Sequence, residues 1–244
     1  MIPKIIHYIW LGGKPLPELV NKCIESWKKY CPDYEIKRWD ESNLDLNKYQ
    51  FAKSAYEQKK YAFASDVFRF DILKQCGGVY LDVDVELVSN IDALLKDEFF
   101  VGFEGGNIIN PGLIMGANKD CEILQDMIEI YKNATFDVNN TPKLTICVFT
   151  TNYLQKKYAL KLDNSCQELS KGIKVYSSDY FCPYNNVTNK FKKTKNTLSI
   201  HWYNASWFTP KQKLKMKFKK FLNIISFGGF GKLAHKIKSK RGNR

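Results

Sequence analysis

The feature that most constrains the fold is a regular alternation of two kinds of segment between residues 5 and 202. Short runs of β-branched and aromatic residues, typical of buried strands, are separated by longer segments whose apolar residues recur with the period of a helix. Strands that alternate with helices usually form a mostly parallel sheet with helices packed against it. The sequence therefore predicts an α/β fold.

The expected elements follow from these patterns and from the Gly and Pro residues that interrupt them. Strands are expected at 5–10, 34–39, 79–81, 99–103, 113–117, 173–176 and 198–202. Helices are expected at 17–31, 49–76, 119–133 and 143–157. The segment 49–76 is interpreted as one long helix that ends at Gly77 and Gly78.

The composition indicates one catalytic domain followed by a basic segment. A chain of 244 residues with 44% apolar residues can bury one sizeable core. Of the 38 Lys and Arg, twelve lie in 210–244 together with no acidic residue, so the preceding chain is nearly neutral. We expect a domain at 1–208 and a basic amphipathic segment at 209–244. The seven scattered Cys contain no CxxC pair and indicate neither a disulfide framework nor a zinc site.

The basic segment has an apolar helical face, formed by Leu214, Phe218, Phe221, Leu222 and Ile225. Flanking lysines would favour peripheral contact with an anionic membrane. The alternative is a helix that packs this face on the domain. Nucleic acid is not expected as a partner, because the basic residues gather at one end and are not interleaved with aromatic residues along a groove.

The apolar content also suggests a location. The first eight residues lack the apolar run of a secretory signal, and no stretch of about 20 apolar residues follows. We expect a cytoplasmic protein that contacts the inner face of the cell membrane if the basic segment binds there.

Two acidic residues, Asp82 and Asp84, follow directly after the apolar run 79–81. Side chains at i and i+2 on extended backbone point to the same side, so both carboxylates can act on one hard cation. Such a cation can bridge a diphosphate and offset the charge that develops when a nucleoside diphosphate leaves. The motif alone is weak, because a solvated turn would look the same.

The preceding helical segment places Asp66 and Arg69 at i and i+3, on one face. An acid and a base in this position can hydrogen-bond sugar hydroxyls, ribose or phosphate. The competing interpretation is an ordinary exposed ion pair on a helix.

Three segments of the chain resemble known motifs in the same order. Residues 61–84, the opening segment 2–13 and the closing segment 201–207 resemble the DXD-containing glycosyltransferases of family 32, which are described as mannosyltransferase-like or as capsular polysaccharide synthesis proteins. The pattern also resembles the catalytic domains of the clostridial glucosylating toxins. The resemblance implies a GT-A fold, a nucleotide-sugar donor and retention of anomeric configuration.

The resemblance also implies roles at the donor site. Trp10 would stack on the nucleotide base, Asp66 and Arg69 would bind ribose and donor sugar, and Tyr80 would support the site. Asp82 would contact ribose or donor sugar and the metal shell. For Trp10 and Tyr80, packing in the core is the alternative.

The closing segment would complete the metal site. The resemblance makes Asp84 the direct ligand of Mn²⁺ or Mg²⁺, with His201 or Ser206 completing the metal shell and Trp207 touching the diphosphate. Arg69, Asp82 and Asp84 are therefore the expected catalytic residues. A lone histidine is also commonly an ordinary buried polar residue, which stays the alternative for His201.

The sequence shows no clear nucleophile. Glu104, after an expected strand, and Asn110 are candidates for contact with the acceptor. A front-face route aided by the donor phosphate would require no protein nucleophile.

Together these features predict a metal-dependent retaining glycosyltransferase that moves a hexose to a glycan or lipid-linked oligosaccharide in bacterial surface polysaccharide synthesis, such as capsule. A UDP-hexose donor is favoured, with galactose first, then glucose or N-acetylglucosamine, and GDP-mannose also open. The alternatives are a nucleotide-sugar hydrolase and a non-enzymatic protein that binds nucleic acid through its basic segment.

Overall fold

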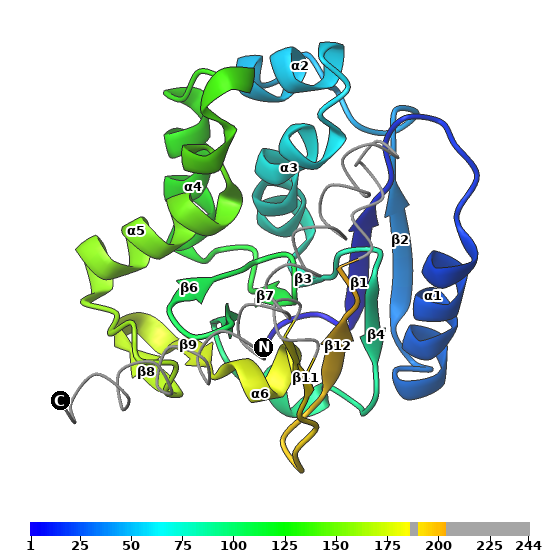
Figure 1. Cartoon of the computed structure of the whole chain (residues 1–244), viewed down its shortest axis with the longest axis vertical. Coiled ribbons are helices and arrows are strands. Elements are labelled where there is room, and N and C mark those ends of the chain that lie inside the picture. The colour runs from blue at the N-terminus through cyan, green and yellow to red at the C-terminus, as the bar shows by residue number, and fades with distance from the viewer. Residues whose placement is uncertain (186–189, 204–244) are drawn as a thin grey trace, which may run out of the picture. The chain divides into compact units, whose positions relative to one another are not determined.

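The computed structural model describes residues 1–185 and 190–203 (Figure 1). One compact unit, formed by Met1–Tyr184 and Lys192–Trp202, contains the main sheet, the helices and the β4–β12 ladder. The expected basic segment 209–244 and the predicted site residues Ser206 and Trp207 lie outside the described residues.

A mixed, mostly parallel sheet forms the centre of this unit. Its strand order is β2-β1-β3-β7-β5-β9-β8, with β6 paired to β5. Strands β2, β1, β3, β5 and β9 run parallel, whereas β7, β8 and β6 are antiparallel to their neighbours. The bounds are β1 Ile5–Ile9, β2 Glu35–Trp39, β3 Gly78–Tyr80, β5 Phe99–Glu104, β6 Ile108–Ile109, β7 Met115–Ala117, β8 Gln167–Leu169 and β9 Ile173–Tyr176. The predicted α/β fold is confirmed.

Helices flank the sheet. Their bounds are α1 Glu18–Tyr30, α2 Gln50–Glu57, α3 Tyr61–Cys76, α4 Glu122–Lys132, α5 Ile146–Tyr158 and α6 Ser178–Phe181, with short 3-10 turns η1 Asp92–Leu94, η2 Val138–Lys143 and η3 Ser170–Gly172. Among the described residues, no helix is both long enough and apolar enough to cross a membrane.

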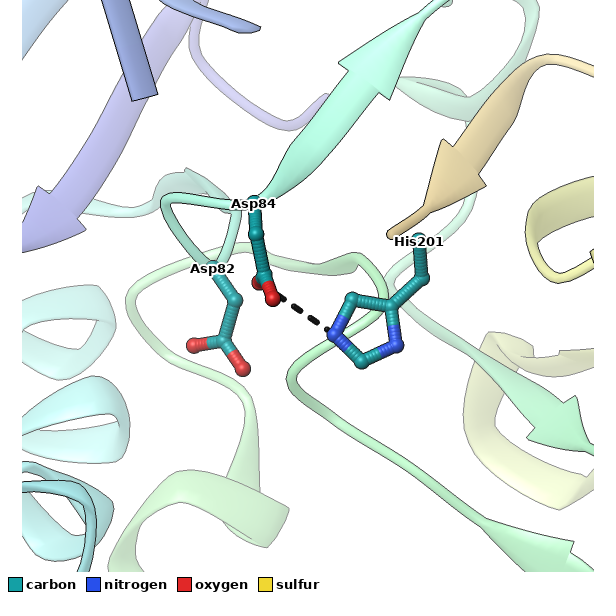
Figure 2. Close-up of side chains that lie close together, drawn as sticks. All are labelled: Asp82, Asp84 and His201. Carbon is teal, nitrogen blue, oxygen red and sulfur yellow. Dashed lines mark ion pairs between the residues drawn. The ribbon is translucent and has the colours of Figure 1, made fainter. Parts of the chain in front are cut away.

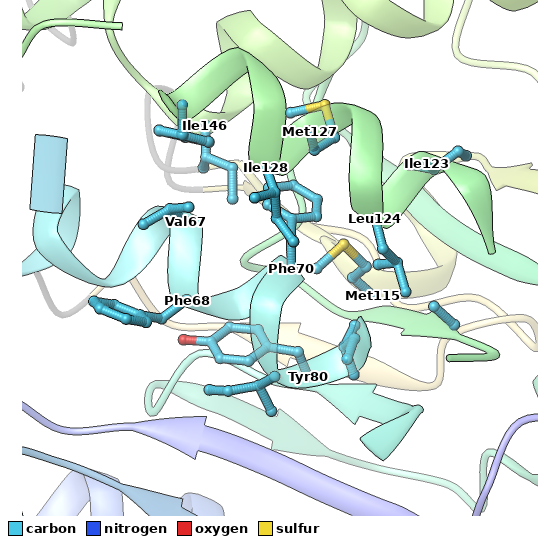
Figure 3. Close-up of a cluster of buried hydrophobic side chains, with 14 of the residues drawn as sticks. Val67, Phe68, Phe70, Tyr80, Met115, Ile123, Leu124, Met127, Ile128 and Ile146 are labelled. Atoms are coloured by element: carbon cyan, nitrogen blue, oxygen red, sulfur yellow. The ribbon is translucent and has the colours of Figure 1, made fainter. Parts of the chain in front are cut away.

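Alternating residues of β5 show how the two faces of the sheet are covered. Phe99, Val101 and Phe103 join the core that contains α3 and α4. Phe100, between them, contacts the ring of Phe181 from α6. Because side chains alternate across a strand, these two sets lie on opposite faces. Figure 3 shows part of the larger core, where side chains of α3 and α4 pack against each other and against Tyr80 and Met115 of the sheet.

The prediction of one helix over 49–76 is wrong. The chain breaks after α2 and restarts at α3, with Lys59 at a positive φ of 57°. Phe51 and Ala55 are buried on α2. A continuous helix would place Lys59, four residues after Ala55, on the same buried face, and burying an unpaired ammonium is costly.

The last expected strand forms, but it lies in a separate two-stranded sheet. Residues 198–202 were expected to form a strand, and β12 spans Ser199–His201, but it does not join the main sheet. It pairs antiparallel with β4, Val85–Leu87, beside which it lies in Figure 1. The sequence analysis did not predict β4, β6, β8, α6, or the short strands β10 Tyr184–Asn185 and β11 Lys190–Phe191.

His7 connects β1, β2 and the turn before β3 through a fully buried imidazole. The indole Nε1–H of Trp39 donates to Nδ1 over 3.1 Å, so the ring proton is on Nε2, which donates to the carbonyl of Gly77 over 2.9 Å. Gly78 permits this contact, because a Cβ there would lie 2.9 Å from Nε2. Burial lowers the pKa of His7 to about 4.

The stability of the protein should therefore depend on pH through His7. The unfolded chain takes up a proton at His7 below about pH 6.5, but the folded protein does so only near pH 4. The free energy of unfolding should fall as the pH falls through this window, by up to about 1.4 kcal/mol per pH unit. Urea unfolding at pH 7 and pH 5 measures the effect. In His7→Gln, which does not titrate, this contribution should vanish; the same pH dependence in both proteins would contradict it.

Candidate active site

Asp82 and Asp84 lie in the tight turn that joins β3 to β4. The backbone N–H of Val85 donates to the carbonyl of Asp82 over 3.0 Å and closes the turn. The backbone N–H of Asp82 donates to the carbonyl of Gly112 over 3.1 Å, which ties the turn to the loop before β7. Both carboxylates therefore sit at the carboxyl end of a parallel strand, where α/β sheets bind their ligands.

His201 reaches this turn from the far end of the chain. In the β4–β12 ladder His201 lies opposite Val85, the residue after Asp84. Its Nε2 lies 3.2 Å from Oδ1 of Asp84. Figure 2 marks this ion pair with a dashed line. One ligand atom from each of Asp82, Asp84 and His201 lies within 4.8 Å of the other two. The pairing of two short strands thus assembles a candidate metal site from residues more than a hundred positions apart.

Arg69 forms the second half of the site. Its guanidinium lies 3.2 Å from Asp82 and 3.4 Å from Asp66, measured from nitrogen to carboxylate oxygen. The hydroxyl of Tyr80 donates to Asp82 over 3.1 Å, and the guanidinium stacks 5.0 Å from the centre of the Tyr80 ring. Asp66 and Arg69 are only 4% and 5% exposed, so the competing interpretation of an ordinary exposed pair does not describe them.

The cluster holds more negative charge than its cations balance. Burial raises the pKa of Asp66 to about 7, although the positive charge of Arg69 opposes the shift. Burial likewise raises the pKa of Asp82 in spite of Arg69, and Asp84 raises it further. Burial alone would lower the pKa of His201, but the neighbouring Asp84 outweighs it and the pKa is raised. A bound cation would relieve this excess of buried negative charge.

Glu104 and Asn110 are joined beside this cluster. The amide of Asn110 donates to Glu104 over 2.8 Å, and its oxygen accepts from the backbone N–H of Gly112 over 2.7 Å. Gly112 touches the site closely, because a Cβ on it would lie 2.2 Å from Oδ2 of Asp82 and 2.9 Å from Arg69. The sequence analysis did not single out Gly112; the only local signal is its place in the turn Asn110-Pro111-Gly112.

Trp10 lies at the carboxyl end of β1. Its side chain is buried, and the indole N–H donates to the carbonyl of Lys14 over 2.6 Å. Stacking of Trp10 on a nucleotide base stays a prediction. The structure thus brings together Asp66, Arg69, Tyr80, Asp82, Asp84 and His201 of the predicted site.

The chain is similar to known glycosyltransferases. Residues 17–101 match the family model described as a glycosyltransferase sugar-binding region containing a DXD motif. The chain is 26% identical over 203 residues to an uncharacterized glycosyltransferase of Acanthamoeba polyphaga mimivirus, covering 78% of this chain and 76% of that protein. It is 36% identical over 153 residues to inositol phosphoceramide mannosyltransferase 3 of Schizosaccharomyces pombe, covering 61% of this chain and 42% of the yeast protein.

A solved structure shows the same fold. It is a glycosyltransferase involved in the glycosylation of the major capsid of PBCV-1, with a TM-score of 0.50 and 15% identity over 87% of this chain and 98% of that one. The fold is that of the GT-A class, and the similarity in sequence identifies a glycosyltransferase. Within the matched residues 17–101, Asp82-Val83-Asp84 is the DXD sequence.

The close approach of Gly112 can be tested directly. In Gly112→Ala the added methyl group would displace the Asp82–Arg69 pair, and a shift of about 1 Å at a site can cost about 100-fold in turnover. We expect a loss of this order in kcat/KM, with the fold retained by circular dichroism. The matched control is Gly116→Ala, whose methyl would meet the ring of Phe100 at 2.1 Å. That variant should lower the melting temperature but leave the kcat/KM of the folded protein unchanged; equal kcat/KM losses would contradict the role of Gly112.

Proposed function

We propose that this glycosyltransferase is metal-dependent and retaining, and that it moves a hexose from a nucleotide sugar to a glycan acceptor. The observation that carries the proposal is the convergence of Asp82, Asp84 and His201 next to the buried Arg69–Asp66 pair. A metal site beside a pair that can bind sugar hydroxyls suits transfer from a sugar diphosphate, because a cation there can stabilise the leaving diphosphate.

The donor atoms fit a divalent cation. Two ligands on one ion, each at about 2.1 Å, lie at most about 4.2 Å apart, so small side-chain movements would bring the three groups onto one ion. Carboxylates suit Mg²⁺ and Mn²⁺, and the imidazole nitrogen of His201 favours Mn²⁺ of the two. When bound, the cation would neutralise charge on the leaving diphosphate.

The chain's own residues would bind and orient the donor. Arg69 can donate to sugar or phosphate oxygens, and Asp66 can accept from sugar hydroxyls. Trp10 is proposed to bind the base. Asp82, held by Arg69 and Tyr80, can accept from ribose or sugar hydroxyls at the edge of the metal site.

The donor is proposed to be a UDP-hexose, with galactose first and glucose or N-acetylglucosamine next. GDP-mannose is retained in the proposal because the yeast relative is named a mannosyltransferase. Choice between these sugars depends on single hydroxyl contacts in the pocket.

The acceptor would meet the Glu104–Asn110 pair. Since the Asn110 amide holds the carboxylate of Glu104, we propose that Glu104 accepts a hydrogen bond from an acceptor hydroxyl rather than attacking the sugar. Retention would then follow a front-face route without a protein nucleophile. We place the reaction in bacterial surface polysaccharide synthesis, in the cytoplasm at the inner face of the membrane.

The proposal is tested by release of nucleoside diphosphate from a panel of UDP- and GDP-sugars, with Mn²⁺ or EDTA, and with a glycan acceptor present or absent. One donor should be turned over with Mn²⁺ only, and Asp84→Ala should lose about 100-fold or more. The control, Asp120→Asn, changes an exposed carboxylate and should behave as the wild type. Full turnover in EDTA would contradict the metal dependence, and release to water alone would identify a hydrolase.

Metal binding should also depend on pH. A metal binds the deprotonated imidazole, so protons compete with Mn²⁺ at His201. Because Asp84 holds the pKa of His201 above its ordinary value, the Kd for Mn²⁺ should rise as the pH falls through that raised pKa, by up to about tenfold per pH unit. Calorimetry between pH 6 and 9 measures this. His201→Asn should bind more weakly at high pH and show a flatter dependence; an unchanged dependence would exclude His201 as a ligand.

A further inference from the structure

The side chain of Trp202 crosses from β12 to β4 directly beside the candidate metal site. Its indole N–H donates to Oε2 of Glu86 over 2.8 Å. Lys22 of α1 approaches the same oxygen at 3.4 Å and lies 5.6 Å from the centre of the indole ring. Lys22 of α1 thus contacts both partners of the Trp202–Glu86 hydrogen bond. This hydrogen bond belongs to none of the sequence motifs described above.

The two strands next to the candidate ligands are anchored to different helices and at different points. Strand β4 is fixed to α1, because the indole of Trp27 donates to the carbonyl of Val85 over 2.8 Å and the backbone N–H of Leu87 donates to the hydroxyl of Ser26 over 2.9 Å. Strand β12 is only three residues long and is held to α6 at its start, where the backbone N–H of Leu198 donates to the carbonyl of Tyr180 over 2.8 Å and the hydroxyl of Ser199 donates to the carbonyl of Phe181 over 3.3 Å. His201 is its last residue, at the other end. Ends of short two-stranded ladders open most readily.

The residue after His201 closes this end of the ladder. The backbone N–H of Trp202 donates to the carbonyl of Asp84 over 3.0 Å, next to the ion pair of Asp84 with His201. Its side chain holds the same residue to Glu86, two positions further along the fixed strand. Trp202 is bonded along the chain to His201 and hydrogen-bonded to the backbone of Asp84, so its position affects both partners of the Asp84–His201 ion pair.

We infer that Trp202 and Glu86 are positioning residues for the metal site: the hydrogen bond between them fixes His201 against Asp84, which directly precedes the strand that α1 anchors. This inference rests on the metal binding proposed above. Mutation of a residue that orients a metal ligand without touching the metal typically lowers the metal affinity by about 10- to 100-fold.

Variants of Glu86 distinguish the effect of its hydrogen bond to Trp202 on metal binding from the effect of its negative charge. Glu86 is acidic and only 18% exposed, so its charge could attract a cation from a distance. In Glu86→Gln the side-chain oxygen can still accept from the indole, whereas the charge is lost. In Glu86→Leu both are lost. If the hydrogen bond between Trp202 and Glu86 positions His201, Glu86→Gln should retain the affinity for Mn²⁺ and Glu86→Leu should not.

The test is the Kd for Mn²⁺ measured by calorimetry on the full chain, together with the melting temperature of each variant. Trp202→Phe and Glu86→Leu should raise the Kd by about tenfold, and Glu86→Gln should stay within about twofold of the wild type. The matched control is Trp39→Phe, which removes the indole hydrogen bond to His7 and should leave the Kd unchanged.

The outcomes separate the two proposals. Wild-type affinity in Trp202→Phe and Glu86→Leu, with no binding by Asp84→Ala, would overturn the positioning role and leave the metal site standing. Equal losses in Glu86→Gln and Glu86→Leu would also overturn it, in favour of charge. Binding of Mn²⁺ that survives Asp84→Ala would instead refute the metal site itself.

Discussion

The ion pair between Arg69 and Asp82 is the interaction on which the site depends. It joins α3 to the turn between β3 and β4, and both partners are largely removed from solvent. A buried guanidinium is tolerated only if carboxylates and hydrogen bonds surround it. Asp66, Asp82 and the ring of Tyr80 meet that need, and the backbone of Gly112 leaves them room. The same acids leave an excess of negative charge, which makes the neighbouring turn a suitable place for a cation.

Separate elements of the fold bring the residues of the candidate site together. The parallel strands bring the end of β3 to the binding edge of the sheet, and α3, buried between α2 and α4, carries Asp66 and Arg69 to the same edge. The small β4–β12 ladder then delivers His201 from a distant part of the chain. The Arg69–Asp66 pair is thus built into the main layers, whereas the contact of Asp84 with His201 depends on the short β4–β12 ladder.

Much of the fold was accessible from local patterns, because burial imposes a period on apolar residues. Strand β9 was predicted at its observed bounds, and β1, β2 and α1 within a residue or two. The long helix over 49–76 was wrong because Lys59 ends the apolar face of α2. Strands β4 and β6 have two or three residues each, too few to show a period. The partner of β12 was missed because pairing between distant strands leaves no local signal.

The sequence by itself determined the class of fold and, through the resemblance of three ordered motifs, the residues of the DXD site. Only the tertiary structure decided how these residues meet: that His201 faces Asp84, that Gly112 lies against Asp82, and that Trp202 bonds to Glu86. Periodicity reports which side of an element is buried, whereas contacts between residues far apart in the chain depend on strand pairing and packing. Those are properties of the whole folded unit, and no single segment encodes them.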